Sequence, residues 1–164
     1  MRFQRAEWRM NEMSEIEAII DELKDIQDGN AWHGPSLNEI LADVAAVQAA
    51  AKPIPSAHSI WEMVLHIAAW EKVFASRLEG HPVEEPEEGD FPPVTETSQE
   101  AWSEALAHLN ESHANLLRVI SNLTDERLSE TVAGKDYSVR FMLRGAVRHN
   151  VYHAGQIMLL RRAC

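Results

Sequence analysis

Apolar side chains recur every three or four residues along four long segments, and this spacing predicts amphipathic helices over residues 14–28, 56–79, 97–123 and 138–162. No segment shows the sustained alternation of apolar and polar residues that marks a half-buried strand. At about 1.5 Å per residue, the longer helices span roughly 35 Å. Four helices of this kind predict an all-α protein with the architecture of a four-helix bundle.

Local signals set the expected helix ends. Ser14 with Glu17, and Thr97 with Glu100, have the spacing of a capping box, in which a hydroxyl and a carboxylate satisfy free backbone N–H groups. Gly29 and Gly80 are the expected stops of the first two long helices. The chain breaks again after residue 123, where a short turn or helix is expected from residue 124.

Two connections differ from simple turns. Residues 31–55 are predicted to hold one short helix over 36–47, before Pro53 and Pro55 interrupt helical structure. This long connection argues against a plain up-down-up-down bundle. Residues 81–97 are rich in proline and acids, which predicts a surface loop. We expect the acids of residues 84–90 to lie away from any functional site.

Composition bounds the class of protein. The chain has 164 residues, of which 45% are apolar, which fits one domain over residues 14–164 after a leader over residues 1–13. A net charge of −11 disfavours nucleic acid and a polybasic membrane anchor. The single cysteine, Cys164, excludes a disulfide or a thiolate metal site within one chain. With no signal peptide and no apolar run of about 18 residues, we expect a cytoplasmic protein.

The eight histidines include three at suggestive positions. His149 and His153 are four residues apart, so they share one face of the last helix, with Arg140, Arg144 and Arg148 on the far side. His66 lies on the apolar face of the second long helix, near Trp70. Three imidazoles from two helices could hold a divalent metal with open positions for water or substrate. A histidine on an apolar face is also a common core residue, and the pattern alone leaves both interpretations open.

Other catalytic classes lack their motifs. The sequence has no Glu-x-x-His of the di-iron carboxylate bundles and no His-Glu-x-x-His of the zincins. A phosphate-binding loop and a nucleophile elbow are also missing.

Three segments resemble the DinB-like superfamily: NAWHGPSL at 30–37, SIWEMVLHIAAWE at 59–71 and RHNVYHAGQIMLLRRA at 148–163. The resemblance covers residues 14–163. It implies an up-down-down-up bundle, often dimeric, with a divalent metal, commonly nickel or zinc, held by three histidines. His66, His149 and His153 match those ligands. The superfamily includes proteins described as metal-dependent hydrolases, and thiol S-transferases that use bacillithiol, mycothiol or glutathione.

The resemblance therefore favours a metal-dependent transferase that joins a low-molecular-weight thiol to a small-molecule electrophile in stress or detoxification. A metal-dependent hydrolase and a non-catalytic metal-binding stress protein are the alternatives. Cys164, at the end of the chain, is a poor nucleophile, so the reactive thiol would come from solution. We expect a homodimer with no nucleic-acid or membrane partner.

Further site residues are predicted around the histidines. Glu62 lies one turn before His66 and is a candidate for orienting a ligand or acting as a base, although an ordinary exposed glutamate fits as well. Four residues are candidates for a pocket: His33, His113, Tyr152 and Gln156. Packing explains Tyr152 and Gln156 equally well, and His113 is also consistent with a core histidine. His58 is expected in the first turn of its helix.

Overall fold

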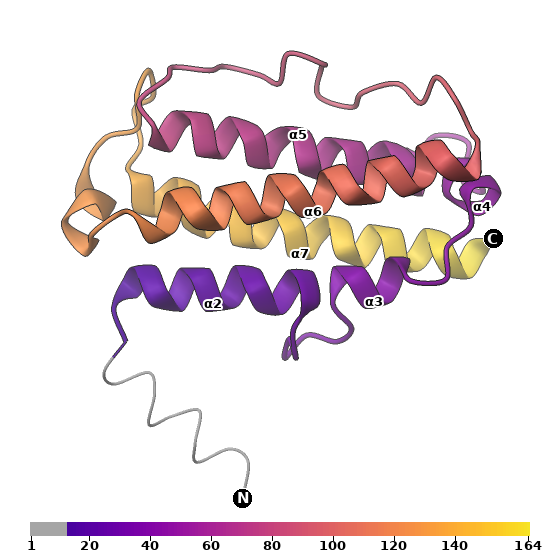
Figure 1. Cartoon of the computed structure of the whole chain (residues 1–164), viewed down its shortest axis with the longest axis horizontal. Helices are drawn as coiled ribbons and strands as arrows, with labels where there is room; N and C mark the ends of the chain where they lie inside the picture. Colours follow the sequence, from indigo (N-terminus) through magenta and orange to yellow (C-terminus); the bar gives the residue numbers. More distant parts are fainter. Residues whose placement is uncertain (1–12) are drawn as a thin grey trace, which may run out of the picture.

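The computed structural model describes residues 13–164, and its regular elements are helices. In chain order they are α2 (Glu15–Asp28), α3 (Leu37–Leu41), α4 (Ala46–Ala50), α5 (Ile60–Leu78), α6 (Gln99–Ser121), the 3-10 helix η1 (Asp125–Ser129) and α7 (Val139–Ala163). The four long helices α2, α5, α6 and α7 pack as a bundle, as predicted (Figure 1). The predicted leader lies, apart from Met13, outside the described residues.

The direction of the helices matches the topology that the resemblance implied. The ribbon of Figure 1 shows α2 and α7 running one way, and α5 and α6 running the other way. Consecutive parallel helices cannot be joined by a tight turn. The segment between α5 and α6, residues 79–98, therefore runs along the whole length of the bundle.

Serine side chains cap the N-termini of most helices. The capping box of Ser14 and Glu17 forms as predicted. The second long helix begins later than expected, because the capping box of Ser59 and Glu62 starts it at residue 60 instead of 56. The third also begins later than predicted, because Ser98, and not Thr97, caps it by accepting a hydrogen bond from a backbone N–H.

The connector 31–55 holds two short helices where one was predicted. The break between α3 and α4 turns the carbonyl of Val44 into the core, where it accepts a hydrogen bond of 2.7 Å from Nε1–H of Trp102. The Trp102 side chain is fully buried and packs against Trp61. A buried indole N–H needs an acceptor, and the interruption of the helix supplies it.

The interior consists of two apolar clusters with a polar layer where they meet. One cluster joins α3 and α4 to parts of α5, α6 and α7, and the other joins α2 and η1 to the opposite parts of the same helices. Buried polar side chains lie at the middle of the long helices, namely His66, Glu71, His113, Asn150 and His153. Burial of polar groups is costly unless they are hydrogen-bonded, so their contacts indicate what they do. None of the helices within residues 13–164 has the length and apolarity to span a bilayer.

Candidate metal centre

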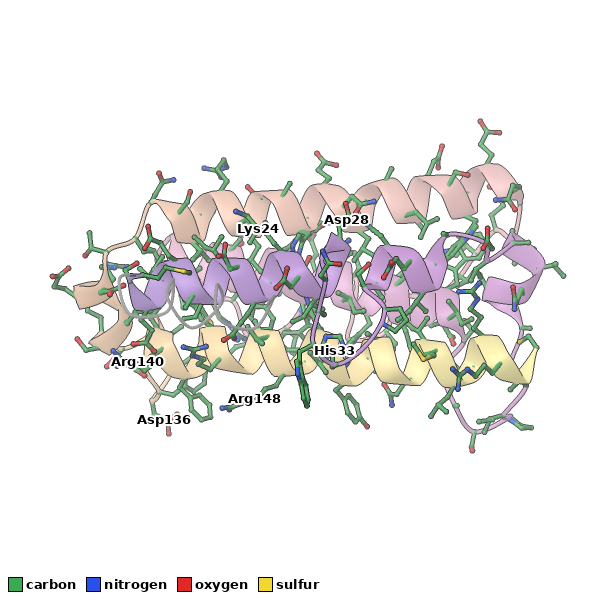
Figure 2. The ribbon with its side chains drawn as sticks, turned by 90° about the horizontal axis from the view of Figure 1, so that it is seen from below. Lys24, Asp28, His33, Asp136, Arg140 and Arg148 are labelled. Carbon is green, nitrogen blue, oxygen red and sulfur yellow. The ribbon has the colours of Figure 1, made fainter. Side chains whose placement is uncertain are left out.

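Three imidazoles meet between α5 and α7. His66 projects from α5, and His149 and His153 project from successive turns of α7. One ring nitrogen of each lies within 4.8 Å of the other two, and Nε2 of His66 is 2.9 Å from Nε2 of His149. The structure thus brings together the three histidines that the helical spacing placed on facing surfaces. On the far side of α7, Arg140 and Arg148 are exposed (Figure 2), and Arg144 pairs with Glu22 of α2.

The other nitrogen of each imidazole contacts an oxygen atom. Nδ1 of His66 donates to the backbone carbonyl of Asp90 at 2.5 Å. Nδ1 of His153 donates to Oε1 of Gln156 at 2.6 Å, and Nδ1 of His149 donates to Oδ1 of Asn150 at 3.3 Å. These oxygens can only accept, so the hydrogen resides on Nδ1 of each ring. Each Nε2 then presents a lone pair to the shared space, as metal-binding histidines do.

Burial keeps these rings neutral. It lowers the pKa of His66 and the pKa of His149 below the ordinary value of 6.5. Burial, together with the charges of the two neighbouring imidazoles, lowers the pKa of His153 to about 4. At neutral pH all three are unprotonated, which is the form that binds metal.

The donor set fits a divalent ion. Imidazole nitrogens are ligands for zinc and nickel. With bonds of about 2.1 Å, two ligands on one ion are separated by about 3.0–3.4 Å, close to the 2.9 Å between His66 and His149. Three protein ligands leave coordination positions open to the neighbouring cavity.

That cavity has a volume of about 670 Å³, and the three histidines form part of its wall. Most of the remaining wall is aromatic or apolar, and includes Trp70, Phe74, Phe91, Tyr137, Phe141, Met142 and Tyr152. Its two cationic side chains are already paired. Arg77 donates to the carbonyls of Val83 and Glu84 and to the Tyr137 hydroxyl, and Lys135 forms an ion pair with the Glu84 carboxylate.

The expectation that the acidic loop lies away from the site is wrong. Besides binding His66 through its carbonyl, Asp90 accepts a hydrogen bond of 2.7 Å from Nε1–H of Trp70. Phe91 stacks flat between His66 and His58, with ring centroids 4.1 and 3.5 Å away. His58 itself precedes α5 and does not lie in its first turn. The loop reaches the site because it must run the length of the bundle to join parallel helices.

Glu62 has a structural task at the start of α5. Its carboxylate accepts a hydrogen bond from the backbone N–H of Ser59 and pairs with Lys52 at 2.9 Å. Burial would raise the pKa of Glu62, but the bonds to Ser59 and Lys52 lower it overall. Glu62 is absent from the described residues that line the cavity. Its suggested role as a base stays a prediction.

The four predicted pocket residues have different positions. Tyr152 lines the cavity, and Gln156 binds the ring of His153. His33 lies on the exposed loop between α2 and α3, apart from the cavity wall (Figure 2). His113 is a buried core residue, with Nδ1 2.9 Å from Oε1 of Glu71. Sequence reasoning placed Glu71 on a different face from His66 and gave it no role, yet it is fully buried.

The fold and the site define a four-helix-bundle protein with a three-histidine centre that could hold a metal ion. The sequence pattern of the DinB superfamily matches residues 31–157, and the chain belongs to this superfamily. Its fold is similar to that of a conserved protein from Enterococcus faecalis, with a TM-score of 0.70 and 19% identity over 92% of this chain and 97% of that one. At this identity the likeness shows the fold alone. No curated protein matches the chain.

Proposed function

We propose that this protein is a divalent-metal-dependent transferase that joins a low-molecular-weight thiol to a small apolar electrophile. The observation that supports it most is the meeting of three neutral imidazoles at the wall of an aromatic cavity. Nickel and zinc are the candidate ions, held by His66, His149 and His153. A bound ion of this kind lowers the pKa of a thiol so that it is present as the nucleophilic thiolate.

The cavity wall suits the second substrate. Aromatic side chains such as Phe74 and Phe141 bind apolar molecules and exclude water from the reacting atoms. The thiol loses its proton to solvent, its sulfur forms a bond to the electrophilic carbon, and the leaving group departs with the electrons of the broken bond. Cys164 is exposed at the end of α7 and is absent from the described cavity wall, so the sulfur comes from a small molecule.

The carboxylates of the cavity favour transfer over hydrolysis. A hydrolase benefits from a base that takes a proton from water. Among the described residues of the wall, the carboxylates are those of Glu84 and Asp90, and each is engaged, the first by Lys135 and the second by Trp70. Transfer from an external thiol needs no such base, because a thiol ionises more readily than water.

The test is metal analysis combined with a conjugation assay. We expect untagged protein to contain one divalent ion per chain and to conjugate monochlorobimane, with loss of chloride, to bacillithiol, mycothiol or glutathione. A chelator, or substitution His66→Ala, His149→Ala or His153→Ala, should abolish both properties. The matched control His58→Ala removes an imidazole that stacks on Phe91 but is not one of the three, and should retain the metal. Metal-loaded protein that conjugates none of these thiols would overturn the transferase, and protein without metal would overturn the centre itself.

A further inference from the structure

We propose that Glu71 is a positioning residue that sets, through Asn150, which nitrogen of His149 faces the metal centre. The inference rests on the metal centre of the proposed function and adds a set of residues outside it. Glu71 belongs to α5, Asn150 and His149 belong to α7, and a third contact comes from His113 on α6.

One carboxyl oxygen is the junction of this network. Oε1 of Glu71 accepts a hydrogen bond of 2.7 Å from Nδ2–H of Asn150 and one of 2.9 Å from Nδ1–H of His113. Glu71 is 0% exposed and Asn150 is 1% exposed, so water does not compete for these contacts. A single oxygen atom on α5 therefore accepts hydrogen bonds from both α6 and α7.

The network has a direction because an amide donates from one end and accepts at the other. Glu71 requires the N–H end of Asn150, so Oδ1 of Asn150 is left to face Nδ1 of His149, 3.3 Å away. An acceptor at that position retains the hydrogen on Nδ1 and leaves the lone pair on Nε2. If the amide rotated by half a turn, its N–H would oppose Nδ1–H and favour the other tautomer, whose Nε2 carries a hydrogen and cannot bind metal.

The contacts also show why support is needed at this histidine. The link between Asn150 and His149 is longer than the common N–H···O distance of about 3.0 Å, and longer than the Nδ1 contacts of His66 and His153. It is thus the link most sensitive to motion of the amide. Stability alone does not account for Glu71, since apolar residues of similar size commonly serve as well as buried charged groups. Moreover, Oε2 of Glu71 and Nε2 of His113 have no hydrogen-bond partner among the described residues.

The test compares two substitutions of Glu71 that differ in one property. Glu71→Gln keeps an acceptor oxygen at nearly constant shape, and Glu71→Met removes it. Gln27→Met is the matched control, because Gln27 is also buried and hydrogen-bonded but contacts Asn38 and Asn110 instead of this network. Two properties are measured: the affinity of metal-free protein for Zn²⁺ or Ni²⁺ by competition with a chromogenic chelator, and the tautomer of His149 by long-range ¹⁵N–¹H NMR without metal.

We expect Glu71→Met to weaken metal binding by about 10-fold or more and to mix the tautomers of His149. Glu71→Gln and Gln27→Met should retain wild-type affinity and the Nδ1–H tautomer. Wild-type metal affinity and tautomer in Glu71→Met would overturn the proposal. A loss of metal affinity in Glu71→Gln as large as in Glu71→Met would also overturn it, because the charge of the side chain and not its acceptor oxygen would then matter.

If Glu71→Met does not fold, Asn150→Ala decides the question, since it removes the acceptor for His149 directly. Unchanged affinity and tautomer in Asn150→Ala would overturn the proposal, and loss of both would support it. Neither measurement uses a thiol or an electrophile. Failure of conjugation by metal-loaded wild-type protein would therefore overturn the transferase and leave this inference standing.

Discussion

Acid should destabilise the metal-free protein, and His153 should account for a large part of the effect. Folding lowers the pKa of this imidazole from 6.5 to about 4. Between pH 6.5 and pH 4 this imidazole is protonated in the unfolded chain and neutral in the folded chain. The free energy of unfolding is therefore retained above pH 6.5 and falls as the pH decreases toward 4. At about 1.4 kcal/mol per pKa unit, the shift corresponds to a loss of about 3 kcal/mol.

The assay is urea unfolding of chelator-treated protein at pH 7.5 and near pH 4, for the wild type and His153→Asn. The asparagine does not titrate in this range, so the difference in free energy of unfolding between the two proteins isolates His153. It should change by about 3 kcal/mol in favour of the variant on acidification. His33→Asn is the matched control, because it makes the same chemical change at an exposed position and should leave the difference from the wild type nearly constant.

A difference between wild type and His153→Asn that is equal at the two pH values would refute this reasoning, since His153 would then titrate alike in the folded and unfolded chains. Metal provides a second check. At a free concentration about 1,000 times Kd, a ligand stabilises the native state by about 4 kcal/mol. This gain should diminish as the pH falls, because protons compete for the same nitrogens.

Three further outcomes follow from contacts elsewhere. Trp102→Phe leaves the buried carbonyl of Val44 without its donor and should lower the free energy of unfolding by about 1–3 kcal/mol, measured in urea, with metal affinity unchanged. Glu62→Ala should cost about 1 kcal/mol through loss of the helix cap, with metal affinity and conjugation rate retained; a large fall in rate at full metal content would instead support Glu62 as a base. Gly145→Met extends a side chain into the cavity from a position where a Cβ meets no atom within 4 Å, so it should slow conjugation while elemental analysis shows unchanged metal content.

Much of the fold and the three histidines could be predicted because they depend on local periodicity. A spacing of four residues places His149 and His153 on one face whatever surrounds the helix. Capping boxes depend on residues three positions apart, so Ser14 and Glu17 identified a helix start without tertiary information. The predicted starts of α5 and α6 were too early by a few residues because two hydroxyl residues lie near each start, as Thr97 and Ser98 do.

The partners of the histidines could not be predicted in this way. Asp90 reaches His66 from a loop 24 residues further along the chain, and it acts partly through a backbone carbonyl, which carries no sequence signal. Glu71 is charged and sits next to Lys72, so its surroundings in the sequence suggest a solvated surface. Its burial depends on where α6 and α7 cross α5. Only the packed structure shows that Asn150 and His113 donate hydrogen bonds to its carboxyl group.

The position of Trp70 gives the protein an intrinsic optical reporter. Of the five tryptophans, Trp61 and Trp102 pack together in the core, and Trp32 is 95% exposed. Trp70 lies with its ring centroid 6.3 Å from that of His66 and 6.5 Å from that of His149, and it also lines the cavity. Under the proposed function, its fluorescence would therefore respond to the ion and to the substrate at one place. An open-shell ion such as Ni²⁺ quenches indole emission at short range, whereas Zn²⁺, with its filled d shell, does not. Emission of Trp70 would therefore distinguish the two candidate ions of the proposed function.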